Sequence, residues 1–245
     1  METTNIWDKY KEIGIIGAGT FGTVYKAINI KTEEYVAIKE INKVKYKQLT
    51  KKYSNEVEIM KKIQSENSIN LRETINTQNN FYIIMDLCLC NLDEYVKMRK
   101  DNLSIEEIRE ILIQLNESLK LMNNNKIIHR DLKPQNILIN LEKINKCVIK
   151  LSDFGSSKFI SKDNTMSIAG TPLSMAPEVL KGKYSLKSDI WSLGILIYYI
   201  LFKSYPYNGK TEVMIYEDIM SGKVIRPFCF FSYEALGKNA KQCFV

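Results

Sequence analysis

The sequence predicts an α+β fold with two lobes, a small β-rich N-terminal lobe and a larger, mainly helical C-terminal lobe. Short β-prone runs bounded by turn residues dominate residues 10–88, with one helical segment among them. Most segments with helical periodicity lie in residues 89–245. A chain of 245 residues can build two lobes with a real core, so we expect one domain over residues 1–245.

Composition and charge are those of an ordinary globular protein. Hydrophobic residues make up 45% of the chain and charged residues 26%. The net charge of +7 comes mainly from lysines that are spread along the chain, with short clusters only at residues 43–52 and 61–62. We therefore interpret the lysines as solvated faces and expect neither a nucleic-acid partner nor an anionic membrane surface.

The cysteines and the apolar runs indicate in which cellular compartment the protein is expected. The cysteines are odd in number and their spacing fits no zinc pattern, which favours reduced thiols. The N-terminus lacks the apolar core of a signal peptide, and the longest apolar run, residues 190–202, is too short to span a bilayer. We expect an intracellular protein of the cytoplasm, with the nucleus left open and with no membrane segment.

A glycine-rich stretch lies between β-prone runs near the N-terminus. Gly17, Gly19 and Gly22 form a G-x-G-x-x-G pattern, which is weak by itself. A dinucleotide-binding fold would continue into a helix, whereas here residues 24–28 and 35–39 both predict strands. The order of strand, glycine loop and strand leaves two interpretations, a flap over phosphates or a hairpin without a ligand.

The second of these strands ends in Lys39, whose ammonium group needs a partner if it is buried. Apolar residues recur with helical spacing over residues 46–64. That segment offers two carboxylates, Glu56 and Glu58, which lie two residues apart and so face different sides of the helix.

The following elements lead towards the middle of the chain. Two strands are predicted within residues 71–87, and a short helix over residues 92–98. Ser104 and Glu107 form a capping box, which predicts a helix from residue 105 to about residue 123.

A polar turn within residues 127–140 then separates an apolar pair from an apolar run. It carries a candidate base, Asp131, a cation, Lys133, and an amide, Asn136. Pro134 restricts the backbone and suits a rigid loop. A base, a cation and a metal-binding amide within six residues are what phosphoryl transfer needs, because that chemistry is mostly positioning and charge stabilisation.

The octet at residues 129–136 reads His-Arg-Asp-Leu-Lys-Pro-Gln-Asn and resembles the catalytic loop of eukaryotic protein kinases. Other family motifs occur in order, including the glycine loop, Val-Ala-Ile-Lys ending at Lys39, Asp-Phe-Gly at 153–155 and Ala-Pro-Glu at 176–178. The resemblance covers about residues 13–222. It implies a protein kinase fold with an N-lobe and hinge at 10–88 and a C-lobe at 89–245 that is incomplete after about residue 228.

The resemblance implies an ATP-dependent protein Ser/Thr kinase, a phosphotransferase that uses ATP and Mg²⁺. Asp131 would orient the substrate hydroxyl and accept its proton, and Lys133 would neutralise charge on the moving phosphoryl group. A lysine at this position marks the Ser/Thr class. Thr171 would hydrogen-bond to both, while Asn136 and Asp153 would hold magnesium.

The nucleotide pocket is also implied by the resemblance. Lys39 would hold the α- and β-phosphates and pair with Glu56, with Glu58 as the competing candidate. Met85 would be the gatekeeper, with the hinge after it, and adenine would lie between apolar side chains of both lobes. The residues implied for nucleotide binding are Ile16, Gly17, Ala18, Gly19, Thr20, Phe21, Gly22, Thr23, Val24, Ala37, Lys39, Met85, Asp86, Cys88 and Leu138.

The resemblance also gives structural roles to residues outside the reaction itself. His129, the only histidine in the chain, would pack beneath the Asp-Phe-Gly segment and not act as a base. Met60, Leu71, His129 and Phe154 would form one apolar column in the active state. Asp189 would hold the backbone of the catalytic loop.

The polar stretch at residues 156–169 resembles an activation loop. The family often pairs an arginine such as Arg130 with a phosphate on that loop. We expect Ser161, Thr165 or Ser167 to be phosphorylated, by an activating kinase or by autophosphorylation, and activity to rise.

The resemblance is weakest near the C-terminus. Ser174 stands where the family usually has tyrosine. Glu178 lacks the arginine that pairs with it in the family, since no arginine follows Arg226. We therefore expect an unpaired carboxylate, an uncovered helix over residues 190–202 and marginal stability.

Alternative functions remain. The chain could be a catalytically weak or inactive nucleotide-binding pseudokinase or scaffold, because of the missing C-terminal helices. A nucleic-acid-binding module has only the net charge to support it and predicts strongly salt-dependent binding. Within the kinases, the catalytic loop and the Gly-Thr-Pro segment resemble the calcium/calmodulin-dependent and the autophagy-initiating groups alike.

Overall fold

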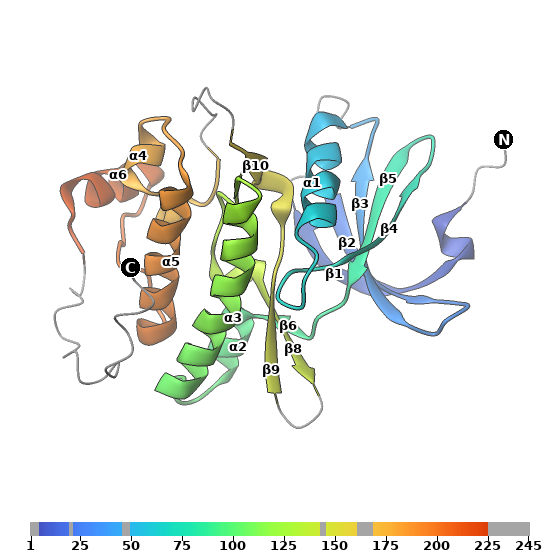
Figure 1. Ribbon diagram of the computed structural model, residues 1–245, viewed down its shortest axis with the longest axis horizontal. Coiled ribbons are helices and arrows are strands. Elements are labelled where there is room, and N and C mark those ends of the chain that lie inside the picture. The colour runs from blue at the N-terminus through green and yellow to red at the C-terminus, as the bar shows by residue number, and fades with distance from the viewer. Residues whose placement is uncertain (1–4, 20–21, 46–49, 143–145, 161–168, 225–245) are drawn as a thin grey trace.

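The N-terminal lobe is a five-stranded antiparallel sheet with one helix, α1, against one face (Figure 1). The computed structural model of the chain describes residues 5–19, 22–45, 50–142, 146–160 and 169–224. The strand order is β1-β2-β3-β5-β4. The elements are β1 (Tyr10–Gly19), β2 (Gly22–Asn29), β3 (Tyr35–Asn42), α1 (Thr50–Lys62), β4 (Leu71–Asn76) and β5 (Asn80–Asp86).

The glycine-rich stretch is more regular than the sequence suggests, because Gly17 and Gly19 belong to β1. Gly17 pairs with Val24, and a register shift between Ile15 and Gly17 bends the strand. Gly22 has a φ of 157°, and a Cβ at this position would lie 1.8 Å from the carbonyl oxygen of Glu40 on β3. Only glycine fits there, so the hairpin lies tightly against the neighbouring strand.

The middle of the sheet, in strands β3 and β5, is buried on both faces. A short 3-10 helix, η1 (Ile6–Asp8), covers the face away from α1, and Ile6 and Tyr10 pack there with Val36 and Ile38 of β3. On the other face Tyr53 of α1 stacks on Phe81 at 4.7 Å between ring centroids.

The C-terminal lobe is mainly helical, with short strands at its junction with the sheet (Figure 1). The expected α+β fold class is confirmed. The predicted capping box is present, since the Glu107 amide donates to Ser104 Oγ at 3.2 Å and the Ser104 amide to Glu107 Oε2 at 2.8 Å. The elements are β6 (Cys90–Asn91), α2 (Leu92–Met98), α3 (Ile105–Asn124), β7 (Ile127–Ile128), β8 (Ile137–Glu142), β9 (Lys146–Leu151), β10 (Lys158–Phe159), α4 (Pro177–Leu180), α5 (Leu186–Phe202) and α6 (Glu212–Ser221).

The run predicted as a buried helix at residues 190–202 lies in α5, which begins at a capping box formed by Ser185 and Ser188. Ile190 is 57% exposed, but Ile195, Leu196 and neighbouring residues of α5 are buried. Among the residues that the structure describes, no helix is long and apolar enough to cross a membrane.

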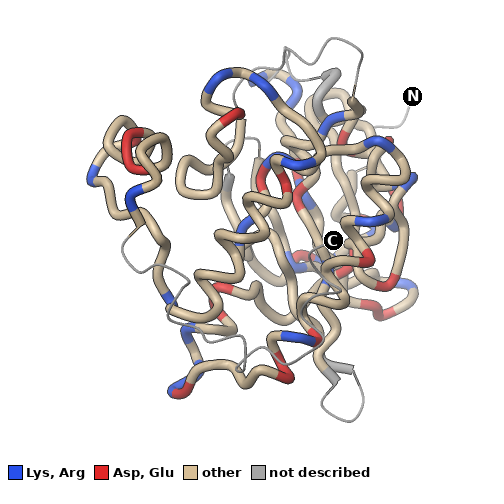
Figure 2. The backbone as a smooth tube through the Cα atoms, turned by 60° about the vertical axis from the view of Figure 1, so that its left-hand side comes forward, with Lys and Arg blue, Asp and Glu red and all other residues tan. Residues whose placement is uncertain are grey.

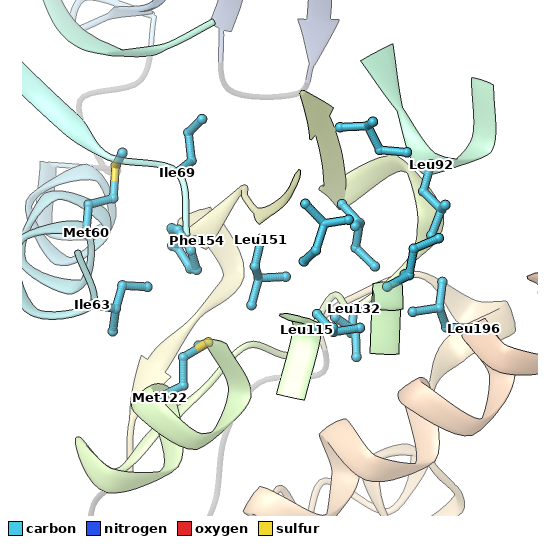
Figure 3. Close-up of a cluster of buried hydrophobic side chains, with 14 of the residues drawn as sticks. Met60, Ile63, Ile69, Leu92, Leu115, Met122, Leu132, Leu151, Phe154 and Leu196 are labelled. Carbon is cyan, nitrogen blue, oxygen red and sulfur yellow. The ribbon is translucent and has the colours of Figure 1, made fainter. Parts of the chain in front are cut away.

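The largest apolar cluster runs without interruption from the N-lobe into the C-lobe. Figure 3 shows Met60 of α1 and Ile63, which follows that helix, beside Phe154 and Leu151, with Leu196 of α5 at the other end. Every one of these five side chains is at most 1% exposed. Because one core crosses the boundary between the lobes, the two lobes are packed as a single body.

Backbone and side-chain hydrogen bonds also join the lobes, along the α1–β4 connection at residues 63–70. The Ile69 amide donates to Leu151 O and the Leu151 amide to Asn67 O, both at 2.9 Å. Asn67 Nδ2 donates to Gln114 Oε1 at 3.0 Å, and Gln114 Nε2 donates to Cys147 O at 2.9 Å. The connection is thereby bonded to α3 and β9 of the other lobe.

A second polar junction lies at the end of β5. Asp86 accepts from Arg72 Nε of β4 at 3.1 Å, and its Oδ2 lies 3.3 Å from Lys150 Nζ of β9. Asn70 Nδ2 donates to the same carboxylate at 3.2 Å, and Arg72 also pairs with Glu34 at 2.9 Å. This carboxylate therefore has partners in both lobes.

Candidate active site

The polar turn between β7 and β8 is fixed from beneath by Asp189 of α5. Its carboxylate accepts from the His129 amide at 2.8 Å and from the Arg130 amide at 3.0 Å. Burial raises the pKa of Asp189. The electrostatic effects of His129 and Arg130 and the hydrogen bonds from their two backbone amides oppose that rise. The role expected for Asp189, holding this backbone, is confirmed. Arg130 has a φ of 70°, a conformation that needs such support in a residue other than glycine.

Asp131, Lys133 and Thr171 form a closed triangle of polar contacts. Lys133 Nζ lies 2.9 Å from Asp131 Oδ2, Thr171 Oγ1 donates to Asp131 Oδ1 at 2.7 Å, and Lys133 Nζ donates to Thr171 Oγ1 at 2.9 Å. Burial raises the pKa of Asp131, but the hydrogen bonds from Lys133 and Thr171 outweigh it, so the pKa lies below its ordinary value. The carboxylate is therefore ionised at neutral pH.

Asn136 contacts the same carboxylate from the far side of the turn. Its Nδ2 donates to Asp131 O at 2.7 Å and to Asp131 Oδ2 at 3.1 Å. Because Nδ2 makes both bonds, Oδ1 of Asn136 is the atom left to coordinate a cation. Asp153 has its side chain 49% exposed towards the same cleft. An amide oxygen and an exposed carboxylate fit Mg²⁺, a cation that prefers oxygen ligands.

The side chains of Lys39 and Glu56 form a buried ion pair, with Nζ 2.6 Å from Oε1. Asp153 Oδ1 lies 3.7 Å from the same ammonium group. Burial lowers the pKa of Lys39, but Glu56 and Asp153 outweigh it and the net pKa is raised, so the lysine stays charged. The expected pairing with Glu56 is confirmed, and Glu58 is exposed on another side of α1.

These groups line one cleft between the lobes, with a volume of about 1300 Å³. Tyr205 and Gln135 also line it. Tyr205 belongs to no motif, and Gln135 lies within the octet at 129–136 but received no role there, so neither was expected in the cleft. Eleven of the implied nucleotide-binding residues line it, namely Ile16, Gly17, Ala18, Gly22, Val24, Ala37, Lys39, Met85, Asp86, Cys88 and Leu138.

Four implied nucleotide-binding residues differ from these. Thr23 is not among the described residues that line the cleft. Its neighbour Val24 faces the cleft, and successive side chains of a strand face opposite sides, so Thr23 faces away from it. Gly19 ends β1 and pairs with Gly22. Thr20 and Phe21 lie outside the described residues.

His129 is completely buried, so it has no access to a substrate. Its ring makes an edge contact with Phe154 at 5.5 Å between centroids, and Nε2 lies 3.0 Å from the carbonyl oxygen of Ser152. Met60 is a member of the same large apolar cluster as Phe154 (Figure 3). Leu71 packs against that cluster. The packing role expected for His129 agrees with this geometry.

The segment before α4 is held by serines, which revises the expectation for Glu178. Ser174 is buried, donates to Thr171 O at 3.1 Å and accepts at its carbonyl oxygen from Ser192 Oγ at 2.7 Å, so this turn is packed without a tyrosine. Glu178 is half-buried and accepts from Ser188 Oγ at 2.9 Å, so it is not the buried, unpaired carboxylate that was expected. Arg226 and the candidate phosphorylation sites Ser161, Thr165 and Ser167 lie outside the described residues.

A β-rich lobe and a helical lobe that enclose a cleft with this arrangement of lysines, carboxylates and amide define a protein kinase domain. The chain belongs to the protein kinase domain family, whose family model matches residues 10–240.

Relatives with substantial identity are Ser/Thr protein kinases. Calcium-dependent protein kinase 5 of Plasmodium berghei (strain Anka) is 37% identical over 239 residues, which are 96% of this chain and 41% of that protein. Serine/threonine-protein kinase 33 of Bos taurus is 34% identical over 220 residues, 86% of this chain and 45% of that protein. Serine/threonine-protein kinase atg1 of Dictyostelium discoideum is 33% identical over 222 residues, 86% of this chain and 33% of that protein. The chain thus spans less than half the length of each of these relatives.

Proposed function

We propose that the chain transfers the γ-phosphate of ATP to serine and threonine hydroxyls of proteins. The observation that carries this proposal is the triangle of Asp131, Lys133 and Thr171 in the same cleft as the Lys39–Glu56 ion pair. The first group can act on a hydroxyl, and the second can hold phosphates. A transfer of phosphate between two bound molecules needs both.

Each residue of the triangle has a distinct part in the proposed reaction. Asp131 is ionised, so its carboxylate can orient the substrate hydroxyl and accept its proton. Lys133 can neutralise the charge that spreads over the moving phosphoryl oxygens. Thr171 donates its hydroxyl proton to Asp131 and accepts from Lys133, and so fixes the separation between base and cation.

At the other end of the cleft, Lys39 would bind the α- and β-phosphates while Glu56 and Asp153 keep the lysine charged and in place. Asn136 and Asp153 would hold Mg²⁺, which supplies neutralisation of the phosphate oxygens when it is bound with ATP. Val24, Ala37 and Leu138, which line the cleft from both lobes, would enclose the adenine.

The test is a phosphate-transfer assay with the purified chain, Mg-ATP and a library of serine and threonine peptides. Transfer that requires Mg²⁺ and is lost in Asp131→Asn supports the proposal. A chain whose melting temperature rises with Mg-ATP but that transfers nothing is a binding-only scaffold, and the proposal is then wrong. Every catalytic position assigned above is filled by a residue type that can act, which favours the enzyme.

We also propose protein substrates and a cytoplasmic location. In the described part of the chain, Lys and Arg are interleaved with Asp and Glu over both lobes and do not gather on one face as a nucleic-acid site would require (Figure 2). Cys88, Cys90 and Cys147 are free thiols, as expected in a reducing compartment. Alanine at Ser161, Thr165 and Ser167 together is expected to lower activity after incubation with ATP, if an activating kinase or autophosphorylation acts on this loop.

A further inference from the structure

Tyr184, between α4 and α5, binds both polar atoms of one backbone unit. Its hydroxyl donates to Ala169 O at 2.6 Å and accepts from the Ala169 amide at 2.7 Å. The side chain is 2% exposed. A tyrosine hydroxyl has one proton to donate and lone pairs to accept with, so this single group satisfies the N–H and the C=O of Ala169 together.

The ring of Tyr184 contacts the catalytic loop at the same time. The guanidinium carbon of Arg130 lies 5.1 Å from the ring centroid, a cation–π distance. Arg130 Nε donates to Ser156 O at 2.6 Å. Tyr184 therefore contacts Ala169 directly and Ser156 through Arg130, and these are the two described ends of the segment that resembles an activation loop.

The residues after Ala169 lead directly to the catalytic triangle. Gly170 has a φ of 115°, and a Cβ there would lie 2.3 Å from the carbonyl oxygen of Arg130. The chain is thus pressed against the catalytic loop with no space for a side chain. Thr171 follows and places its hydroxyl between Asp131 and Lys133. A displacement of Ala169 must be passed on to Thr171, because only one constrained residue lies between them.

We propose that Tyr184 is a positioning residue whose hydroxyl fixes Ala169 so that Thr171 is held between Asp131 and Lys133. This inference rests on the proposed phosphotransferase function. Tyr184 does not line the described part of the cleft, so it acts through Thr171 and not on ATP or on the substrate.

The first test measures the contact itself and needs no activity. In Tyr184→Phe the ring keeps its place under Arg130, but the hydroxyl that pairs with Ala169 is gone. The amide proton of Ala169, followed by NMR hydrogen exchange, should exchange at least about tenfold faster in this variant than in the wild type. Tyr207→Phe is the matched control, since Tyr207 is also buried in the C-lobe and should leave Ala169 unchanged. Unchanged protection of Ala169 in Tyr184→Phe overturns the inference, as does an Ala169 amide that is unprotected in the wild type.

The second test is a kinetic double-mutant cycle with Thr171→Ala. Tyr184→Phe should lower kcat about tenfold, equivalent to about 1.4 kcal/mol of transition-state stabilisation, while the Kd for Mg-ATP is unchanged. In the Thr171→Ala background the same substitution should change kcat less than twofold. An equal loss in both backgrounds would mean that Tyr184 only stabilises the fold, and the inference is then wrong. A wild-type chain that transfers no phosphate refutes the proposed function, while the exchange test still decides whether Tyr184 holds Ala169.

Discussion

Asp131 receives hydrogen bonds from two side chains, and its neighbour Asn136 donates to both its carbonyl and its carboxylate. These contacts predict that Asp131→Asn abolishes phosphate transfer and leaves ATP binding intact. The replacement keeps the size of the side chain but removes the base, a contribution of about 10²–10⁴ in rate. The rate is measured with a peptide substrate and the Kd with Mg-ATP. Asp101→Asn, an exposed position, is the control, and near-wild-type turnover of the Asp131 variant contradicts the assignment.

The depressed pKa of Asp131 predicts how activity depends on pH. The pKa of Asp131 is lower in the folded than in the unfolded chain, so the ionised carboxylate stabilises the folded state. This contribution to folding is present above the ordinary aspartate pKa of about 4 and is lost as the pH falls through the folded-state pKa. Activity should be lost over the same range, because protonated Asp131 cannot act as a base. Lys133→Met removes a main cause of the depression, so the acid limb of kcat/KM should move to higher pH. The pH–rate profiles of both proteins check this, and an acid limb that stays in place would show that another group sets it.

Lys39 and Glu56 are both largely buried, so each depends on the other. Replacing Glu56 by Gln leaves a buried ammonium with Asp153 at 3.7 Å as its remaining anion. Breaking a buried pair costs about 3–5 kcal/mol, and Asp153 should keep the loss near the lower value. Chemical denaturation measures it, with Glu58→Gln as a control on the same helix. Equal effects of the two substitutions would contradict the pairing as a source of stability.

At the scale of elements, the start of α3 rests on the reciprocal bonds of Ser104 and Glu107. Ser104→Ala should destabilise the domain by about 1 kcal/mol, because it leaves an amide of the first turn without its side-chain acceptor. For a domain of this size that corresponds to about 2–4 °C in melting temperature. Ser104→Asp retains an acceptor and should melt close to the wild type; if both variants melt alike, the cap contributes nothing.

Helices with apolar periodicity and polar caps could be predicted, whereas the glycine-rich hairpin could be predicted only in part. α2 and α3 have apolar residues at helical spacing and polar caps, and both were expected within a residue of their observed bounds. The β1–β2 hairpin was missed in part, since Gly17 and Gly19 read as a loop but pair in β1. A glycine indicates that the backbone can bend at that position, but it does not predict whether a neighbouring strand will form hydrogen bonds with it.

The site could be predicted where the chemistry requires particular residue types at a fixed spacing. It could not be predicted where the contacts join residues that are distant in the sequence. Asp131, Lys133 and Asn136 lie within six residues, so the turn shows its chemistry in the sequence. Tyr184 binding Ala169, and Ser188 binding Glu178, join a side chain to a partner 10 or more residues away. Such bonds have no periodicity, because one partner is a backbone group or one of many serines.

For the whole molecule, the α1–β4 connection should contribute strongly to stability through Gln114. Its side chain donates to Cys147 O, accepts from the Ile149 amide and accepts from Asn67. Gln114→Ala leaves partly buried backbone groups without partners, each costing about 1–3 kcal/mol. We expect a loss of about 2–4 kcal/mol in urea denaturation. Asn116→Ala, exposed on the same helix, should change little, and a matching loss there would contradict the role of Gln114.

The two polar junctions between the lobes limit how the lobes can move. They are the α1–β4 connection, bonded to Gln114, and Asp86 with its partners Arg72 and Lys150. The two are neighbours, because Asn70 at the end of the connection donates to Asp86 Oδ2. Asn55 of α1 adds a third contact, a bond of 2.8 Å from its Nδ2 to Ser157 O. Separating the lobes must break these hydrogen bonds and the shared apolar core together, so we expect both lobes to unfold in one cooperative transition.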